Sequence, residues 1–336
     1  MRSKHISLLS RLKLLLEYYF DSPFEEELNS YIHIVDGDIT DENLADTLKD
    51  VKFDTLINSA AIVKHFSNDD IIEKINVGGV KNLIDIAIAH KARMIQISTL
   101  SVAGINIDSK FADNFRMKEN QLDIGQDLSN KYIRSKFDAE VAMMEAIADR
   151  GLDGKVVRVG NLMSRQSDGE FQINSVTNGF MRSLRGYNAL NMFPISGLDE
   201  TTDFSPIDEV AKSILVLATA PKEFTMFHSA NSHPVEMGDV VEALNSCGLK
   251  IDCVKDDVFM NAIIEANNDE AKSKKVAALI TYSSNDNHTQ SYILTDNSFT
   301  IKALYRLGYK WPITDQEYLK KAIKSLISLD YFERDD

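Results

Sequence analysis

The sequence is poor in cysteine and proline and has no long apolar run, and each shortage excludes a class of protein. Its 336 residues include two cysteines, Cys247 and Cys253, which form no metal-ligand spacing with any histidine. The six prolines do not cluster, so the chain contains no proline-rich linker. No apolar run approaches the ~20 residues of a membrane-spanning helix, and no signal peptide is recognisable. We therefore expect a reduced cytoplasmic protein that does not enter a membrane.

Basic side chains are also in short supply. The sequence has 37 lysines and arginines against 51 aspartates and glutamates, which gives a formal net charge of −14. This balance argues against general nucleic-acid binding, which needs clustered positive charge to neutralise phosphates. Hydrophobic residues make up 44% of the chain and charged residues 26%, as is typical of a globular protein.

The 15 glycines include no Gly-x-Gly-x-x-Gly or Gly-x-x-Gly-x-x-Gly motif, the turn that normally holds a dinucleotide pyrophosphate. What the chain does contain is an alternation of strands and helices. Short apolar runs predict strands over 31–35, 53–58, 92–98 and 155–159, and helical periodicity predicts helices over 7–20, 42–49, 69–89 and 128–149. This pattern predicts an α/β fold, a Rossmann-like doubly wound parallel sheet with helices on both faces.

The alternation weakens after Gly160, where helices are predicted over 173–185, 206–219 and 235–246. We therefore expect an incomplete nucleotide-binding portion over 1–160, without its first strand, turn and helix. A smaller substrate-binding region is expected over 161–336, and the two are expected to interleave as one body.

Two neighbouring motifs carry the candidate chemistry. Ser98 and Thr99 end a predicted strand, and Tyr132 and Lys136 follow on a predicted helix. Tyr132 and Lys136 are one helical turn apart and share a face, so the ammonium is expected to lower the pKa of the phenol and to aid proton transfer. Thr99 would donate a second hydrogen bond to the same substrate oxygen. The Tyr-x-x-x-Lys spacing alone also occurs on ordinary exposed helices, but the strand end before it favours a catalytic role.

Candidate cofactor-binding residues follow the predicted strands, because parallel α/β sheets bind ligands beyond the carboxyl ends of their strands. Asp38 and Ile39 follow the strand 31–35 and are expected to contact an adenine; a turn capped by an aspartate is the alternative. Asn58, Ala60 and Ala61 end the next strand, where small side chains allow either a ligand or a tightly crossing helix to approach.

Three further candidates complete this set. Asn76 lies inside the long helix beside two glycines, for which close helix packing is the alternative explanation. Asn161 and Leu162 follow the strand 155–159, near the expected position of a nicotinamide. The histidines show no ligand spacing, so we assign no metal site.

With these residues in place, the chain resembles the terminal thioester reductase domains of nonribosomal peptide synthetases and carboxylic acid reductases, which are extended short-chain dehydrogenases. The resemblance covers nearly the whole chain. Its most diagnostic part is the tail at 307–312 and 318–319, which a sugar-nucleotide epimerase is not expected to carry. The other segments that carry it are 35–39, 58–61, 98–102, 132–136, 158–163, 203–211 and 227–231.

The resemblance implies an NADPH-dependent reduction of an acyl or peptidyl thioester, held on the phosphopantetheine arm of a carrier domain, to an aldehyde or an alcohol. It assigns Thr99 and Tyr132 to the thioester carbonyl, and Lys136 to Tyr132 and the nicotinamide ribose. Arg2 aligns with the basic residue expected at the 2′-phosphate of NADPH. The family's N-terminal strand, Gly-rich turn and helix have no counterpart in the chain, so a truncated reductase is expected.

Two other hypotheses stay open. Another extended short-chain dehydrogenase, such as a sugar-nucleotide epimerase or dehydratase or a fatty acyl-CoA reductase, would share the scaffold and act on a free substrate without a carrier. A non-catalytic remnant would keep the fold without binding the cofactor, as the absent Gly-rich turn suggests.

Overall fold

The computed structural model describes residues 6–63, 70–107, 110–112, 114–172, 178–269, 272–283 and 290–332. Contacts divide the chain into two compact units, residues 1–52 and residues 53–336. No helix in the described ranges combines the length and the apolar character that crossing a bilayer requires. The predicted division at residue 160 stays a prediction.

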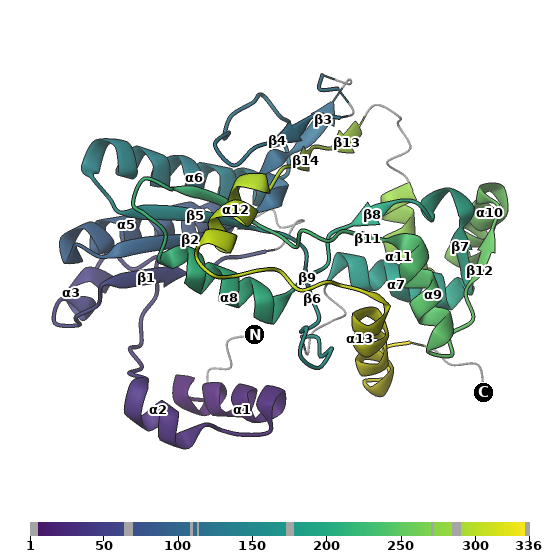
Figure 1. Cartoon of the computed structure of the whole chain (residues 1–336), viewed down its shortest axis with the longest axis horizontal. Coiled ribbons are helices and arrows are strands. Elements are labelled where there is room, and N and C mark those ends of the chain that lie inside the picture. Colours follow the sequence, from purple (N-terminus) through teal and green to yellow (C-terminus); the bar gives the residue numbers. More distant parts are fainter. Residues whose placement is uncertain are drawn as a thin grey trace. The chain divides into compact units, whose positions relative to one another are not determined.

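The first unit is helical in its described part. It contains α1 (Leu8–Phe20), α2 (Glu25–Tyr31) and α3 (Leu44–Leu48), drawn in purple in Figure 1. Ser7 caps α1 by accepting a hydrogen bond from the N–H of Ser10 at 3.1 Å. The helices predicted over 7–20 and 42–49 are confirmed.

The strand predicted over 31–35 is wrong. Residues 32–38 form neither helix nor strand, and the side chains of Tyr31 and Ile32 are exposed. A strand needs a neighbour to exchange its backbone hydrogen bonds, and the described part of the first unit contains no other strand. Asp38 therefore lies in a turn and not at the end of a strand.

The second unit is built on a four-stranded parallel sheet (Figure 1). Its order is β1 (Thr55–Asn58), β2 (Arg93–Thr99), β5 (Gly154–Val159) and β10 (Met226–Ser229). Thr99 and Ser229 both pair with Val159, so the carboxyl ends of these strands meet at one edge. The predicted strands 53–58, 92–98 and 155–159 and the parallel α/β fold are confirmed. Periodicity does not predict β10, which comes from beyond Gly160.

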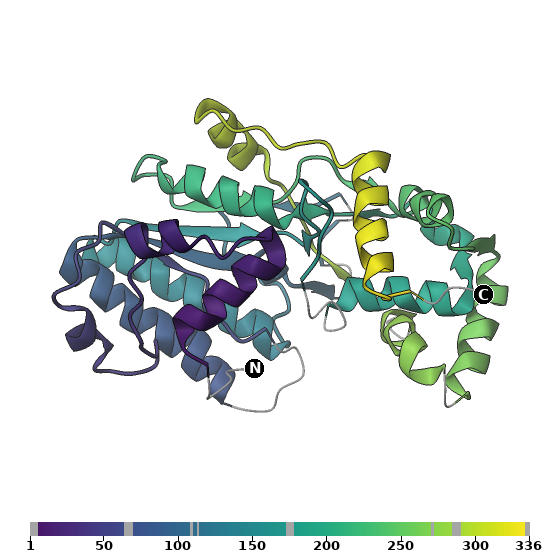
Figure 2. The ribbon, with the colours of Figure 1, turned by 90° about the horizontal axis from the view of Figure 1, so that it is seen from below.

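Helices cover both faces of this sheet (Figure 2). The helix predicted over 69–89 is divided, because one π-helical turn separates its two parts. On one face lie α4 (Ile71–Glu73), the π turn η1 (Lys74–Gly78), α5 (Gly79–His90) and α6 (Lys131–Arg150); on the other lie α8 (Ile207–Ala218) and α12 (Ser298–Arg306).

The two faces of the sheet differ in polarity. Under α8 and α12, Ile95, Val157 and Phe227 belong to an apolar core. Because side chains alternate along a strand, the neighbouring residues Ser98 and Arg158 turn towards α6, and both are buried. The layer between the sheet and α6 is therefore partly polar.

The remainder of the second unit is mainly helical and has its own core, which includes Met181, Leu244 and Tyr318. Its helices are α7 (Gly179–Leu190), α9 (Met237–Ser246), α10 (Asp256–Asn267), α11 (Ser273–Ser283) and α13 (Gln316–Ser328). Helices α7, α8 and α9 match the three predicted after Gly160, although residues 173–177 of the first prediction lie outside the described ranges.

Short elements connect these parts. Two 3-10 turns are η2 (Leu100–Ala103) and η4 (Ile195–Gly197). The two-stranded pairs are β3 (Ile105–Ile107) with β13 (Gln290–Tyr292), β4 (Arg116–Met117) with β14 (Leu294–Thr295), β6 (Leu162–Met163) with β9 (Ser205–Pro206), β7 (Met192–Pro194) with β12 (Asp252–Val254), and β8 (Thr201–Thr202) with β11 (Val235–Glu236).

Candidate active site

The three predicted catalytic residues lie together at the carboxyl end of β2. Thr99 is the last residue of β2, and its Oγ1 accepts a hydrogen bond from the N–H of Ser101 at 3.2 Å, which caps η2. Asn130 caps α6 by accepting from the N–H groups of Tyr132 and Ile133, so Tyr132 stands in the first turn. The side chains of Tyr132 and Thr99 are hydrogen-bonded. β2 and α6 thus bring two hydroxyl groups to one place.

Lys136 follows Tyr132 by one turn of α6, and only 5% of its surface is exposed. Its Nζ donates a hydrogen bond to the carbonyl of Ile97 at 2.6 Å. Burial lowers the pKa of Lys136 to about 8, and the negative charge of Glu140, one turn further along α6, opposes that change. At neutral pH the side chain is therefore an ammonium anchored on β2.

The predicted net lowering of the pKa of Tyr132 is wrong. Burial raises the pKa of Tyr132, and the hydrogen bond with Thr99 offsets only part of that rise. A buried phenolate loses its hydration, and the ammonium of Lys136 is engaged by the carbonyl of Ile97. Tyr132 therefore keeps its proton at neutral pH, which suits a proton donor.

The residues after β1 lie at the same edge of the sheet as Thr99. Asn58 is 3% exposed; its Nδ2 donates to Gln96 Oε1 at 2.8 Å, and its Oδ1 accepts from the N–H of Ala60 at 3.0 Å. Asn58 thus shapes the turn that follows β1. Ala60 is exposed and Ala61 is half-buried, so their backbone is open to a ligand.

Asn76 fastens this same turn to α6. Its Oδ1 accepts from the N–H of Ile62 at 2.8 Å, and its Nδ2 donates to the carbonyl of Ile62 at 3.0 Å and to Ser135 Oγ at 2.9 Å. The amide lies in η1, and π turns of this kind are frequent at functional sites. The Asn76 side chain acts on the protein backbone, so any effect on a cofactor passes through the turn that it holds.

Asn161 and Leu162 follow β5 and are both exposed. The N–H of Asn161 donates to Asp203 Oδ2 at 2.8 Å, and Ser205 Oγ donates to Asp203 Oδ1 at 2.6 Å. Burial raises the pKa of Asp203 to about 6 in spite of these hydrogen bonds. A Cβ added to Gly160 would lie 1.8 Å from Asp203 Oδ2, so this contact requires glycine. Asp203 therefore fixes the path of the chain after β5.

The remaining predicted cofactor residues belong to the first unit. Asp38 Oδ1 accepts hydrogen bonds from the N–H and the Oγ1 of Thr40, both at 2.9 Å, which is the capping role considered as the alternative. The adenine contacts of Asp38 and Ile39 stay predictions. Arg2 lies outside the described residues.

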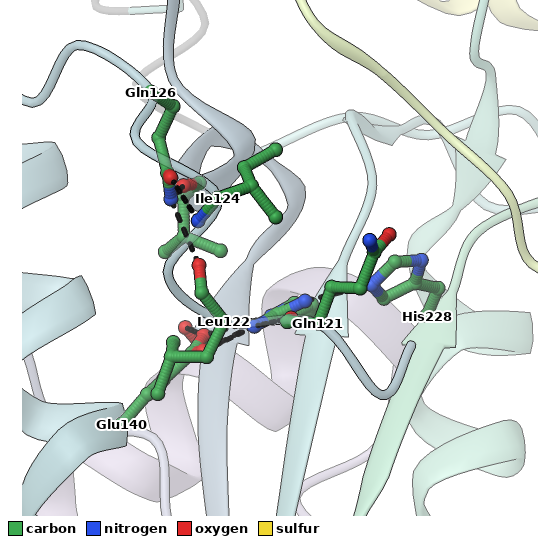
Figure 3. Close-up of polar contacts among 9 residues, drawn as sticks. Gln121, Leu122, Ile124, Gln126, Glu140 and His228 are labelled. Carbon is green, nitrogen blue, oxygen red and sulfur yellow. Dashed lines mark hydrogen bonds and ion pairs between the residues drawn. The ribbon is translucent and has the colours of Figure 1, made fainter. Parts of the chain in front are cut away.

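A buried polar network lies further along α6 (Figure 3). Arg158 Nη2 and Glu140 Oε2 form an ion pair at 2.7 Å, and both side chains are fully buried. The hydroxyl of Ser98 donates to Glu140 Oε1 at 2.5 Å. Arg158 also donates to the carbonyl of Gln121 at 3.0 Å and lies 3.0 Å from His228 Nε2. The network therefore joins α6 to β2, β5, β10 and the loop before α6.

His228 is neutral in this network. Burial and the positive charge of Arg158 lower the pKa of His228 to about 3. Because Arg158 can only donate, Nε2 must accept, and the proton lies on Nδ1, which donates to the carbonyl of Asp296 at 2.7 Å. One sequence signal for the network is the spacing of Glu140, four residues after Lys136.

The loop before α6 is held by Gln126 (Figure 3). Its Nε2 donates to the carbonyls of Val102 and Leu122 at 3.0 and 2.9 Å, and its Oε1 accepts from the N–H of Ile124 at 2.9 Å. Since Asn130 begins α6 only four residues later, this clamp helps to fix the helix that carries Tyr132.

The geometry favours chemistry at a carbonyl group. Two hydroxyls, one of them on a phenol that keeps its proton, lie beside a buried cation. Such donors stabilise the negative charge that develops on a carbonyl oxygen when a nucleophile or hydride adds to its carbon.

Comparison with known proteins places these features in a family context. Residues 1–214 match the model of an NAD-binding family described as male sterility protein. A component of the linear gramicidin synthase of Brevibacillus parabrevis is 23% identical over 284 residues, which are 84% of this chain. This chain spans 5% of the length of that synthase component.

Two solved structures show the likeness in three dimensions. A thiolation-reductase di-domain from an archaeal nonribosomal peptide synthetase is 37% identical, with a TM-score of 0.88; the match covers 98% of this chain and 69% of the di-domain. The reductase domain of an aureusimine biosynthetic cluster is 26% identical, with a TM-score of 0.77, over 95% of this chain and 80% of that one.

Proposed function

This chain belongs to the family of NAD-binding reductases that includes the male sterility proteins and the reductase domains of nonribosomal peptide synthetases, and on that premise we propose a specific reaction. The chain uses NADPH to reduce an acyl or peptidyl thioester, carried on the phosphopantetheine arm of a carrier domain, to an aldehyde. The observation that carries the proposal is the grouping of Thr99, Tyr132 and Lys136 at the carboxyl end of β2. The archaeal relative, in which a thiolation domain accompanies the reductase domain, supports the carrier as partner.

Thr99 and Tyr132 act on the thioester carbonyl. Both hydroxyls donate hydrogen bonds to its oxygen, and a bound nicotinamide cofactor would supply a hydride to its carbon. Tyr132 gives its proton to the oxygen as the charge develops there, a transfer that its raised pKa permits because the proton is still present at neutral pH. In the resulting hemithioacetal the C–S bond breaks as the C=O bond forms, and the hydroxyl proton passes to the leaving sulfur, which yields an aldehyde and a free thiol.

Lys136 is the cation of the site. Its ammonium stabilises the phenolate that Tyr132 becomes after it gives up its proton, and it would donate to the ribose hydroxyls of a bound cofactor. Both roles need Lys136 to leave or share its hydrogen bond to the carbonyl of Ile97. Its burial strengthens the electrostatic effect of the charge.

The residues at the carboxyl edge of the sheet fit a nicotinamide cofactor. Ala60 and Ala61 leave their backbone open after β1, and Asn161 and Leu162 are exposed after β5. We propose that these four residues contact the cofactor directly. Asn58 and Asn76 would act by shaping the turn after β1, and Asp38, Ile39 and Arg2 are proposed for the adenosine end.

The deciding experiment incubates the full chain with an acyl thioester on a carrier domain, with NADPH or NADH, and captures any aldehyde as an oxime. Aldehyde formed from the carrier-bound thioester with NADPH supports the proposal. Turnover of free acyl-CoA at equal efficiency would instead indicate a fatty acyl-CoA reductase. Tight NADPH binding without turnover of either thioester would contradict the proposed substrate, and the absence of cofactor binding would indicate a remnant. A second reduction is tested by the appearance of alcohol after the aldehyde.

A further inference from the structure

Glu140 connects three elements next to the candidate groups of the second unit's site: α6, on which it lies, and the strands β2 and β5. On α6 it stands one turn after Lys136. Through Ser98 Oγ, at 2.5 Å, it holds the residue next to Thr99 on β2. Through Arg158, at 2.7 Å, it holds β5 three residues before Asn161. One fully buried carboxylate thus connects the strand ends on which the proposed reaction depends.

We propose that Glu140 is a positioning residue for the reduction: its carboxylate fixes the ends of β2 and β5 against α6 and supplies the negative charge beside Lys136. The catalytic part of this inference rests on the proposed function. The effect of the Glu140 charge on Lys136 does not depend on a cofactor or a substrate, so it can be tested in the protein by itself.

A gain in folding stability does not explain why the ion pair of Glu140 and Arg158 is buried. A helix packs on a sheet at lower free-energy cost with apolar side chains than with an ion pair, because two ions must give up their hydration. The pair of Glu140 and Arg158 is nevertheless fully buried. A carboxylate one turn from a buried lysine has a clear electrostatic effect, because it favours the ammonium form that burial disfavours.

Glu140 is the charged neighbour that acts on Lys136. On β2, the nearby side chains of Ser98 and Thr99 are neutral hydroxyls, and Asn76 on η1 is a neutral amide. The other charged or titratable groups on the packed elements have partners of their own. Arg158 of β5 pairs with Glu140, His228 of β10 with Arg158, and Tyr132 with Thr99. Asp138 of α6 is attracted by Arg134 and Lys81 and repelled by Glu73.

The test is an NMR titration of Lys136 in protein labelled with ¹³C at lysine Cε, with the resonance assigned by a Lys136→Arg variant. We expect Glu140→Gln to lower the pKa of Lys136 by roughly one pH unit or more, since an opposite charge at this range has effects of that size. Glu140→Asp keeps the charge and should retain most of the wild-type value. His228→Gln is the matched control, because it changes the far end of the same network and leaves the carboxylate in place.

The outcomes are distinct. If Glu140→Gln does not fold, because Arg158 is left as a lone buried charge, the double variant Glu140→Gln with Arg158→Met is titrated in its place. A lowered pKa of Lys136 in either variant, with no change in His228→Gln, supports the proposal. The proposal is overturned if Lys136 keeps its wild-type pKa in the variant that folds, or if His228→Gln changes the pKa of Lys136 by the same amount.

Kinetics then separates this inference from the proposed function. Where the wild type reduces the thioester, Glu140→Gln should lose kcat at a lower alkaline pH than the wild type, and Glu140→Asp should restore most of that range. Unchanged pH profiles would overturn the catalytic part. A wild type that reduces no thioester refutes the proposed function, whereas the NMR titration still decides whether Glu140 sets the charge of Lys136.

Discussion

At the scale of single residues, Tyr132 is the side chain on which the proposed reduction depends most directly. Replacing it with phenylalanine keeps the buried ring and removes only the hydroxyl that bonds to Thr99. A positioned proton donor contributes typically 10²–10⁴-fold to rate, so we expect kcat of Tyr132→Phe to fall by about that factor. The free energy of unfolding of this variant should fall by about 1 kcal/mol, because one hydrogen bond is lost. Steady-state kinetics and urea denaturation measure the two effects, and a kcat close to that of the wild type would remove Tyr132 from the mechanism.

Gly160 provides a second residue-scale prediction, because Asp203 occupies the space that a side chain would need. The Cβ of Gly160→Ala would lie 1.8 Å from Asp203 Oδ2, so the carboxylate must move away from the N–H of Asn161. We expect a loss of roughly 1–3 kcal/mol in the free energy of unfolding and a higher KM for the nicotinamide cofactor. Gly78→Ala is the control, since nothing lies within 4 Å of its added Cβ. It should be stabilising by roughly 0.5–1 kcal/mol; equal effects of the two variants would contradict this account.

At the scale of elements, the π turn η1 is held in place through Asn76. Asn76→Leu removes three hydrogen bonds, two to the backbone of Ile62 and one to Ser135. Because the Ile62 groups then lack partners, we expect a loss of roughly 2–3 kcal/mol in the free energy of unfolding. Faster hydrogen exchange at the Ile62 amide should accompany it. Lys74→Ala, at an exposed position in the same turn, should change stability by less than about 0.5 kcal/mol. Retained protection of the Ile62 amide in Asn76→Leu would show that the turn is held by other contacts.

The elements also show what sequence periodicity can and cannot predict. The central strands and the helix α6 could be predicted because burial imposes their period on the residues. The strand β10 could not, since its four residues include the buried polar pair His228 and Ser229, a composition that looks like a loop. The segment 31–35 shows the opposite error, because the sequence predicts a strand that the structure does not contain. Its apolar alternation is suited to a strand, but a ladder also needs a neighbour.

The residues of the candidate site also differ in whether the local sequence can predict them. Thr99, Tyr132 and Lys136 could be predicted because a strand end and a helical spacing fix where they lie. The partners of Asn58 and Asn76, and the connection of Glu140 to β2 and β5, depend on residues far away in the sequence. The pKa of Tyr132 was predicted in the wrong direction because local spacing shows the nearby charge and does not show the burial that outweighs it.

At the scale of the whole molecule, two groups whose pKa values are shifted by desolvation give the stability a pH dependence with opposite signs. The folded-state pKa of His228, about 3, lies below its ordinary 6.5. Its contribution is therefore present above pH 6.5 and is lost as the pH falls towards 3. The folded-state pKa of Asp203, about 6, lies above its ordinary 3.8. Its contribution is present below pH 3.8 and is lost as the pH rises through 6. Between pH 6 and 4 the two effects largely cancel in the wild type.

Replacing one of these two groups should reveal the pH dependence of stability that the other group causes. Each group changes the free energy of unfolding by about 1.4 kcal/mol per pH unit within its range. On going from pH 7.5 to 5, we expect His228→Gln to gain roughly 2 kcal/mol relative to the wild type, because the unfolded state no longer takes up the proton of the histidine. Asp203→Asn should lose roughly 1 kcal/mol over the same range. Urea denaturation of the three proteins at both pH values measures these differences. If the free energy of unfolding of each variant changes with pH just as that of the wild type does, neither group titrates differently in the folded and unfolded protein. If His228→Gln instead loses stability relative to the wild type at the lower pH, the imidazole is charged in the network with Arg158.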